Sequence, residues 1–389
     1  MVMKSEKIFY DIAKHSLNKK DEELCGDNVE IFKSDNRLTI VLADGLGSGV
    51  KANILSTLTT KIAGTMLQKG SSIEETINTV MNTLPVCNVR KIAYSTLAII
   101  DINKYDEASI IQYDNPPVFY KRKGEIIDLP YKTLNFGGKN VKLSKIKLML
   151  NDTITLVSDG VIHAGVGRIL NHGWEWHHVA DYLQKQNIKN SEKYNRRLID
   201  TCSNLYAGSP GDDTTAVTLK IRNPEITNIF TGPPDNPAKD KDVVRDFLSL
   251  EGRKIICGGT AANIFSREMD KDISTSFDYI DPEVPPIGNI KGLDLVTEGI
   301  LTLKKLLSKF ELYSNSISEV NFNKKDGATL LMKILLEEST HVNIWFGRAM
   351  NPAHQNPDLP VDLSIKLNIV GRIANILKSF GKTVSIKYL

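Results

Sequence analysis

The sequence predicts an α+β chain in two parts, in which two packed antiparallel β-sheets flanked by helices precede a smaller α/β domain with a mostly parallel sheet. The first observation is a cluster of strand-like segments in the middle of residues 9–221, bounded by pairs of helical segments. The second is a change of composition at Asn223, where a proline-rich stretch begins. The third is the strand-then-helix alternation that follows it. A chain of 389 residues is long enough for both parts.

The elements of the first part follow from hydrophobic periodicity. Alternating or β-branched runs predict strands at residues 10–15, 29–32, 38–42, 96–101, 108–113, 118–123, 125–128, 146–149, 153–157 and 216–221. Apolar residues at helical spacing predict helices at residues 51–67, 73–84, 175–185 and 193–206. We therefore expect one domain over residues 1–223.

The second part begins after an expected linker. Prolines at Pro224, Pro233, Pro234 and Pro237 predict an extended connection over residues 224–239. A domain over residues 240–389 is then expected, regulatory or ligand-binding and of unknown function. Its predicted strands are residues 254–257, 293–296, 342–346 and 383–388, and its predicted helices end near residues 268, 310, 338 and 380.

Composition excludes several classes of protein. The 49 basic and 46 acidic residues leave a net charge of +3, which favours neither a nucleic-acid nor a membrane partner. The four cysteines are too far apart for a zinc or redox motif and are typical of buried thiols in a reducing compartment. No apolar run approaches the ~20 residues of a membrane span, and no signal peptide is evident. We expect a cytoplasmic protein, and its Lys-, Ile- and Asn-rich composition suggests a bacterial genome rich in A·T.

Acidic residues stand repeatedly at strand edges, where aspartate is disfavoured. Asp44 ends an apolar strand in VLADGLGSGVKA, and Asp159 ends another in TITLVSDG. Asp212 and Asp213 precede a strand in GDDTTAVTLKI, and Asp27 precedes one in LCGDNVEIF. Asp-Gly is also a common turn, so a single such motif is weak. Several together indicate carboxylates that converge at one end of a sheet, as a site for Mg²⁺ or Mn²⁺ requires.

The ordered set GD, ADGLGSG with a following helix, SDG and GDDTT resembles the metal-dependent PPM (type 2C-like) protein phosphatases, and its glycine-rich form resembles their SpoIIE-like branch. The resemblance covers about residues 9–221. It implies a two-sheet sandwich and a serine/threonine phosphatase that uses two Mn²⁺ or Mg²⁺ ions. It also implies a phosphoprotein substrate in bacterial signalling, such as an anti-sigma-factor antagonist.

Residue roles are expected from the chemistry and the resemblance together. Two ions that activate a bridging water need one carboxylate with both oxygens available, and Asp44 is our candidate. The carbonyl of Gly45 and the carboxylate of Asp27, directly or through water, would serve one ion, whereas the resemblance assigns Asp159 and Asp212 to the other. We therefore expect Asp44, Asp159 and Asp212 to be catalytic. Asp213 and Thr215 are expected to support the ligands without binding the ions.

The chain departs from the SpoIIE-like pattern near the substrate. Ser48 stands where many members carry histidine or asparagine, and Leu46 where they carry methionine. No N-terminal arginine matches the phosphate-binding arginine of the wider PPM family. The general acid is unassigned; His163 is the histidine nearest to Asp159 in sequence, but a loop position is the simpler interpretation.

Two further motifs have competing interpretations. His172, His177 and His178 lie among tryptophans and resemble a metal site in density, but adjacent histidines do not share a helix face, so we interpret them as a helix entry with aromatic packing. Gly258, Gly259 and Thr260 are either a tight turn or an anion-binding helix start for a small ligand.

Three functions stay open at the level of the sequence: a protein phosphatase, a small-molecule phosphatase, and a pseudophosphatase binding module regulated through the C-terminal domain. The sequence does not predict the oligomeric state.

Overall fold

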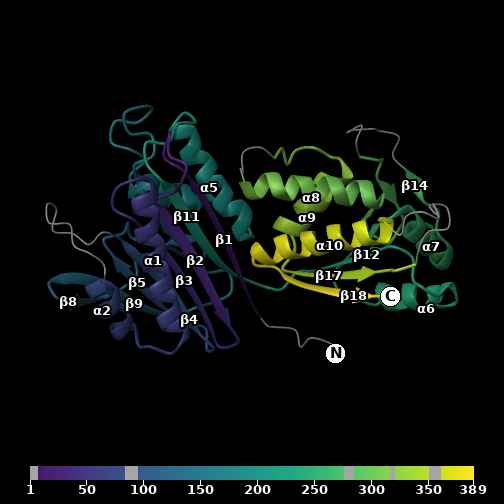
Figure 1. Ribbon diagram of the computed structural model, residues 1–389, viewed down its shortest axis with the longest axis horizontal. Coiled ribbons are helices and arrows are strands. Elements are labelled where there is room, and N and C mark those ends of the chain that lie inside the picture. Colours follow the sequence, from purple (N-terminus) through teal and green to yellow (C-terminus); the bar gives the residue numbers. More distant parts are fainter. Residues whose placement is uncertain (1–7, 84–94, 276–283, 316–319, 350–360) are drawn as a thin grey trace. The chain divides into compact units, whose positions relative to one another are not determined.

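The computed structural model describes residues 8–83, 95–275, 284–315, 320–349 and 361–389 (Figure 1). The chain divides into two compact units, one comprising Tyr10–Arg222 and the other including Asn223–Leu389. We call them the N-terminal and C-terminal units and describe each by itself.

The first sheet of the N-terminal unit is antiparallel and has six strands in the order β2-β3-β4-β5-β9-β8. The strands are β2 (Asp27–Ser34), β3 (Arg37–Asp44), β4 (Leu97–Asn103), β5 (Glu107–Tyr113), β8 (Lys132–Phe136) and β9 (Lys139–Lys147). Helices α1 (Gly49–Gln68) and α2 (Ile73–Thr83) bury apolar residues such as Leu67 and Ile77 against Val41 and Ile99 of this sheet. This buried layer holds the ends of β2 and β3 in place.

The second sheet has five strands in the order β1-β11-β10-β6-β7. They are β1 (Phe9–Leu17), β6 (Phe119–Arg122), β7 (Glu125–Ile126), β10 (Thr153–Val157) and β11 (Thr214–Arg222). The helices that follow its strands are α3 (Asp159–Ile162), α4 (Trp176–Lys185) and α5 (Ser191–Leu205). The expected pair of antiparallel sheets with flanking helices is confirmed.

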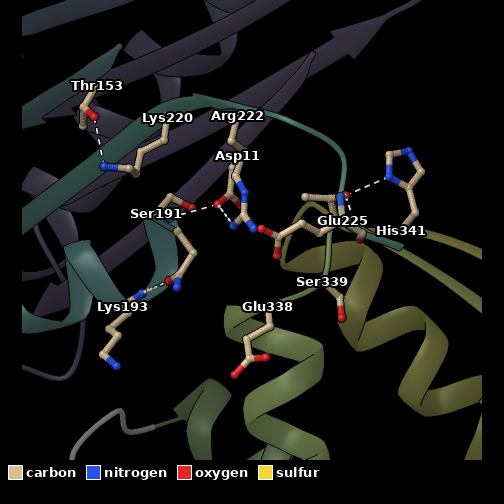
Figure 2. Close-up of polar contacts among 12 residues, drawn as sticks. Asp11, Thr153, Ser191, Lys193, Lys220, Arg222, Glu225, Glu338, Ser339 and His341 are labelled. Atoms are coloured by element: carbon tan, nitrogen blue, oxygen red, sulfur yellow. Dashed lines mark hydrogen bonds and ion pairs between the residues drawn. The ribbon is translucent and has the colours of Figure 1, made fainter. Parts of the chain in front are cut away.

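Charged side chains are buried beside this second sheet (Figure 2). Arg222 donates from Nη1 to Asp11 Oδ2 at 2.9 Å, and the backbone N–H of Ser191 donates to the same oxygen at 2.9 Å. Lys220 donates to Thr153 Oγ1 at 3.0 Å. These contacts join β1, β11 and the first turn of α5 by charge-assisted hydrogen bonds.

The C-terminal unit contains a seven-stranded sheet in the order β14-β15-β16-β13-β12-β17-β18. Five neighbouring strands of this sheet, β16, β13, β12, β17 and β18, are parallel to one another. β14 and β15 pair antiparallel at the edge next to β16. The bounds are β12 (Ile226–Thr231), β13 (Arg253–Cys257), β14 (Ser274–Thr275), β15 (Gly288–Asn289), β16 (Leu295–Thr297), β17 (His341–Phe346) and β18 (Thr383–Tyr388). The expected mostly parallel sheet is confirmed.

Helices cover both faces of this sheet. They are η1 (Pro237–Lys239), α6 (Asp240–Leu248), α7 (Gly259–Met269), α8 (Ile300–Asn315), α9 (Gly327–Glu337) and α10 (Val361–Ser379). Residues of α6 and α7 form one apolar core with Phe230 and Ile256, and residues of α8, α9 and α10 form another with Ile229 and Ile255. Because neighbouring residues of one strand point to opposite faces, the sheet is the middle of three layers. None of the helices in the described segments has the length and apolarity needed to span a membrane.

Two expectations about elements were wrong. The expected linker contains β12, which lies between β13 and β17 at the centre of the parallel sheet. Its prolines only flank the run ITNIFT, and proline is tolerated just outside a strand. The strand expected at residues 146–149 is β9, which ends at Lys147 and forms a hairpin with the unpredicted β8. Exposed lysines that alternate along this hairpin weaken its hydrophobic signal.

Candidate active site

Asp27 and Asp44 lie directly opposite each other in the β2–β3 pair. Asp27 is the first residue of β2 and Asp44 the last of β3, so the antiparallel register brings both to one end of the sheet. The backbone N–H of Gly45 also donates to the carbonyl of Gly26 at 3.2 Å. Pairing thus continues past the two acids and holds them at the rim of the sheet.

Gly45 lets the chain leave β3 and enter α1. A Cβ at this position would stand 2.1 Å from the carbonyl oxygen of Ala52, which no side chain tolerates. The following turn uses Gly47 and Gly49 with φ of 109° and 64°. The glycine-rich motif is therefore required by the close approach of α1 to the end of β3.

Asp159 and the GDD loop meet through backbone contact. Asp159 is the first residue of α3 and is separated from β10 by Ser158 alone. A Cβ on the next residue, Gly160, would stand 2.1 Å from the carbonyl oxygen of Asp213. The hydroxyl of Tyr206 donates to the carbonyl of Gly160 at 2.7 Å. The start of α3 is thus packed against the residues that precede β11.

Asp213 is buried and uses both carboxylate oxygens on backbone N–H groups. Lys19 donates to Oδ1 at 3.0 Å and Gly26 donates to Oδ2 at 2.8 Å. Thr215 lies deeper, where its N–H donates to the Ser158 hydroxyl and its hydroxyl donates to Ser16, each at 2.9 Å. Both residues connect the loop before Asp27 with the strands β10 and β11.

The acids of this region perturb one another. Burial, and then repulsion from Asp213 and Asp159, raises the pKa of Asp27 to about 7. Burial and the charges of the other site aspartates raise the pKa of Asp44 to about 9. The pKa of Asp212 is raised by burial and by Asp159. Such mutual effects require the carboxylates to lie near one another, so the structure brings the four sequence motifs together.

Asp27 is the acid whose surroundings fit a cation best. Its side chain is 5% exposed, and neither carboxylate oxygen has a hydrogen-bond partner among the described residues. The hydroxyls of Ser158 and Thr215 are near enough to lower its pKa in part, but they form no hydrogen bond of normal geometry with it. A buried carboxylate without donors is costly unless a cation lies beside it. The donor set of carboxylates is the one that Mg²⁺ and Mn²⁺ prefer.

Lys19, which sequence reasoning missed, is a further residue of the site. Its Nζ lies 3.8 Å from Asp212 Oδ1, and the side chains are 36% and 46% exposed. The loop that carries it is held by its own N–H on Asp213 and by the N–H of Lys20 on the carbonyl of Pro210 at 2.9 Å. No local signal distinguishes Lys19 from other surface lysines, because its place depends on the docking of two loops distant in sequence.

The histidine-rich stretch enters a helix with aromatic packing, as expected. Trp176 stacks on Phe119 with ring centroids 5.1 Å apart, and Trp174 contacts Tyr182 edge to face at 5.0 Å. His177 and His178 are exposed beside Glu175, and the potential ligand atoms of these three residues all lie within 4.8 Å of one another. Among the described residues, no three of the site aspartates have carboxylate oxygens that all lie within 4.8 Å of one another, so the site aspartates are spread more widely than this group. A wider spread is compatible with two ions ~3.5–4 Å apart.

Gly258, Gly259 and Thr260 lie at the end of β13 and the start of α7 in the C-terminal unit. The five aspartates of the candidate site belong to the N-terminal unit.

Comparisons with known proteins identify the N-terminal region. Residues 34–222 match the family model described as Stage II sporulation protein E (SpoIIE). The chain is 24% identical over 206 residues to Stage II sporulation protein E of Bacillus subtilis (strain 168), which covers 50% of this chain and 24% of that protein. The chain thus spans about a quarter of the length of that relative.

One similar solved structure is the phosphatase domain of the cell fate determinant SpoIIE from Bacillus subtilis, with 20% identity and a TM-score of 0.44. The match covers 56% of this chain and 94% of that chain. A second is the serine/threonine phosphatase of S. agalactiae, at 16% identity and a TM-score of 0.41, covering 55% and 99%. The match to the family model and the sequence relative lead to one conclusion. Residues 34–222 are a SpoIIE-like region.

Proposed function

We propose that the N-terminal unit is a metal-dependent phosphatase that hydrolyses phosphoserine or phosphothreonine on a protein substrate. The observation that carries the proposal is the facing pair Asp27 and Asp44, with the buried, unpartnered oxygens of Asp27 and three further aspartates close by. The match of residues 34–222 to the SpoIIE family supports the reaction class. A bacterial phosphoprotein in cytoplasmic signalling is the substrate that this match favours.

The roles of the residues follow from their places. Asp44 would bridge two Mn²⁺ or Mg²⁺ ions, with Asp27 and the Gly45 carbonyl toward one ion and Asp159 and Asp212 toward the other. The ions, when bound, would acidify a water and offset negative charge on the phosphoryl oxygens. Oxygen-only ligands suit both metals, so the donor set does not favour either.

Other residues of the chain would orient this machinery. Asp213 holds the backbone before Asp27, and Thr215 ties β11 to β10 through Ser158. Lys19 would place its ammonium beside the substrate phosphate, in a chain that has no arginine matching that of the wider PPM family. A lysine is suited to this as a mobile point charge.

Hydrolysis of para-nitrophenyl phosphate tests the reaction, with Mn²⁺, Mg²⁺ or EDTA and with the variants Asp44→Asn and Asp159→Asn. We expect metal-dependent turnover that falls by several orders of magnitude in both variants, because electrostatic stabilisation dominates such catalysis. A panel of phosphopeptides and phosphorylated metabolites then separates a protein phosphatase from a small-molecule phosphatase. A folded protein that binds Mn²⁺ and turns over none of these substrates would contradict the proposal and favour a binding module.

A further inference from the structure

Lys366, on the first turns of α10, is a largely buried cation that the proposed phosphatase site does not use. Its Nζ lies 3.3 Å from the point at which a Cβ on Gly232 would stand, and 5.9 Å from the centroid of the Phe346 ring. Within the described part of the chain, no carboxylate lies within 4.0 Å of this ammonium and no hydrogen bond to it is formed. Burial lowers its pKa. Burying an ammonium without a counter-ion costs stability, so packing alone does not account for a lysine here.

The nearest opposite charge is already engaged. Glu298 is close enough to raise the pKa of Lys366 somewhat, but its carboxylate accepts the N–H of Leu301 at 3.1 Å and so caps the start of α8. Cys257 is fully buried, and burial raises its pKa to about 11, so it does not supply an anion at neutral pH. The Lys366 charge is therefore left available to a ligand.

Lys366 stands at the carboxyl edge of the parallel sheet, where glycines follow four adjacent strands. Gly232 follows β12, Gly258 follows β13, Gly347 follows β17, and Gly299 lies two residues beyond β16. Their backbones are in contact, since Gly347 N–H donates to Thr231 O and Gly258 N–H donates to Thr297 O, each at 2.9 Å. Gly232 and Gly347 are packed against each other, because a Cβ on Gly232 would stand 2.5 Å from the carbonyl oxygen of Gly347, whereas the nearest neighbour of a Cβ on Gly258 would be 3.9 Å away.

The strand order reverses at the same place. β12 is first in sequence, β13 and β16 lie successively on one side of it, and β17 and β18 lie on the other. In open parallel sheets, ligands bind outside the carboxyl ends of the strands where the order reverses. Lys366 and Gly232 lie on this point, because Gly232 ends the first strand.

We propose that this edge of the C-terminal unit binds a phosphate-bearing small molecule, with Lys366 as its cation. Open space at the Cβ positions of Gly258 and Gly259 lets a phosphate approach the backbone closely there, and this turn leads into α7, whose first N–H groups favour an anion. Lys366 supplies the charge that a phosphate needs and that no described carboxylate neutralises. The residues named for this site all belong to the C-terminal unit, and the proposal does not depend on the proposed function of the aspartates.

Calorimetric titration of the full-length protein with inorganic phosphate, AMP and ATP tests this site. EDTA is present throughout, and the titration is repeated in the Asp44→Asn variant, so that binding at the aspartate site is recognised. We expect at least one probe to bind and Lys366→Met to weaken it at least tenfold, because the variant keeps the length of the side chain and loses its charge. Lys378→Met, an exposed lysine on the same helix, is the matched control and should bind as the wild type does.

A second variant guards against a folding defect. Gly259 has open space around the position of a Cβ and no positive φ, so Gly259→Ala should fold normally. It should weaken binding several-fold by placing a methyl group where the phosphate approaches. Thermal unfolding of Lys366→Met should occur at the wild-type temperature or above it, since a buried unpaired charge is removed. Absence of binding of all three probes at millimolar concentration, or equal binding by wild type and Lys366→Met, would overturn the proposal.

Discussion

The carboxylate of Asp213 accepts the backbone N–H of Gly26 at 2.8 Å, so a residue of the loop before β11 holds the residue that precedes Asp27. The other oxygen of Asp213 accepts the N–H of Lys19. Asp213 thus joins three parts of the proposed site, the loop with Lys19, the start of β2 and the loop with Asp212. We therefore expect Asp213 to act on the proposed metal ligands by holding the backbone that positions them, without binding the metal itself.

Asp213→Ala is expected to weaken Mn²⁺ binding by about 10–100-fold, the usual cost of losing an outer partner of a metal site. At saturating Mn²⁺ the rate should recover in large part, because no proposed ligand is removed. Titration calorimetry and activity against Mn²⁺ concentration measure both effects. Asp35→Asn, at an exposed turn, is the control. An unchanged Mn²⁺ affinity would show that the two backbone contacts do not position the site.

Asp44→Asn should make the metal-free protein more stable. Burial and the surrounding acids raise the pKa of Asp44 to about 9, so folding at pH 8 requires a carboxyl that is ionised in the unfolded chain to take up a proton, and asparagine avoids this cost. We expect a gain of at least about 1 kcal/mol in the free energy of unfolding in EDTA at pH 8. Added Mn²⁺ should stabilise the wild type and leave the variant nearly unaffected. Denaturant unfolding with and without Mn²⁺ decides this, and a variant less stable than the wild type in EDTA would argue against a repulsive cluster.

Lys19→Ala should raise the KM for a phosphorylated substrate about tenfold, which corresponds to ~1.4 kcal/mol. The reason is the loss of an ammonium 3.8 Å from Asp212, beside the expected phosphate position. Lys19→Arg should restore most of the affinity, and inhibition by free phosphate should follow the same order. Lys20→Ala is the matched control, since its neighbouring side chain is exposed and forms no described ion pair. Equal KM values for the Lys19 and Lys20 variants would show that Lys19 forms an ion pair at the surface and does not contribute to substrate binding.

Lys220 makes the stability of the N-terminal unit depend on pH. It is 8% exposed, its Nζ lies 4.4 Å from the centroid of the Tyr194 ring, and burial lowers its pKa to about 8. The folded protein therefore binds this proton more weakly than the unfolded chain, so the contribution of Lys220 to stability rises with pH from about 8 to 10.5. The gain across this interval is roughly 3 kcal/mol.

Lys220→Met should remove that dependence, because methionine fills similar space without a charge. Urea unfolding of both proteins at a series of pH values gives the difference in stability. The variant should be the more stable at pH 7, and its advantage should shrink as the pH approaches 10.5. A difference that does not change with pH would mean that the Lys220 pKa is not lowered in the folded state.

Local patterns in the sequence were sufficient for most strands and helices of the N-terminal unit. β3 is an apolar run that ends at Asp44, and β10 is one that ends at Val157, two residues before Asp159; their periodicity is a property of adjacent residues. The resemblance to the SpoIIE-like branch rests on the same short motifs. The strand β12 was missed because prolines lie on either side of it, and β8 because its five residues, KTLNF, include only two apolar ones.

The sequence by itself determined which acids stand at strand ends, that two antiparallel sheets come first and that a parallel sheet follows. Only the tertiary structure decided that Asp27 faces Asp44, that Asp213 holds Gly26, and that Lys19 reaches Asp212. It likewise placed Lys366 of α10 beside Gly232, the residue after β12 and more than a hundred residues earlier. The physical reason is that periodicity and turn chemistry act over a few residues, whereas register, sheet order and loop docking depend on packing between segments far apart in the chain.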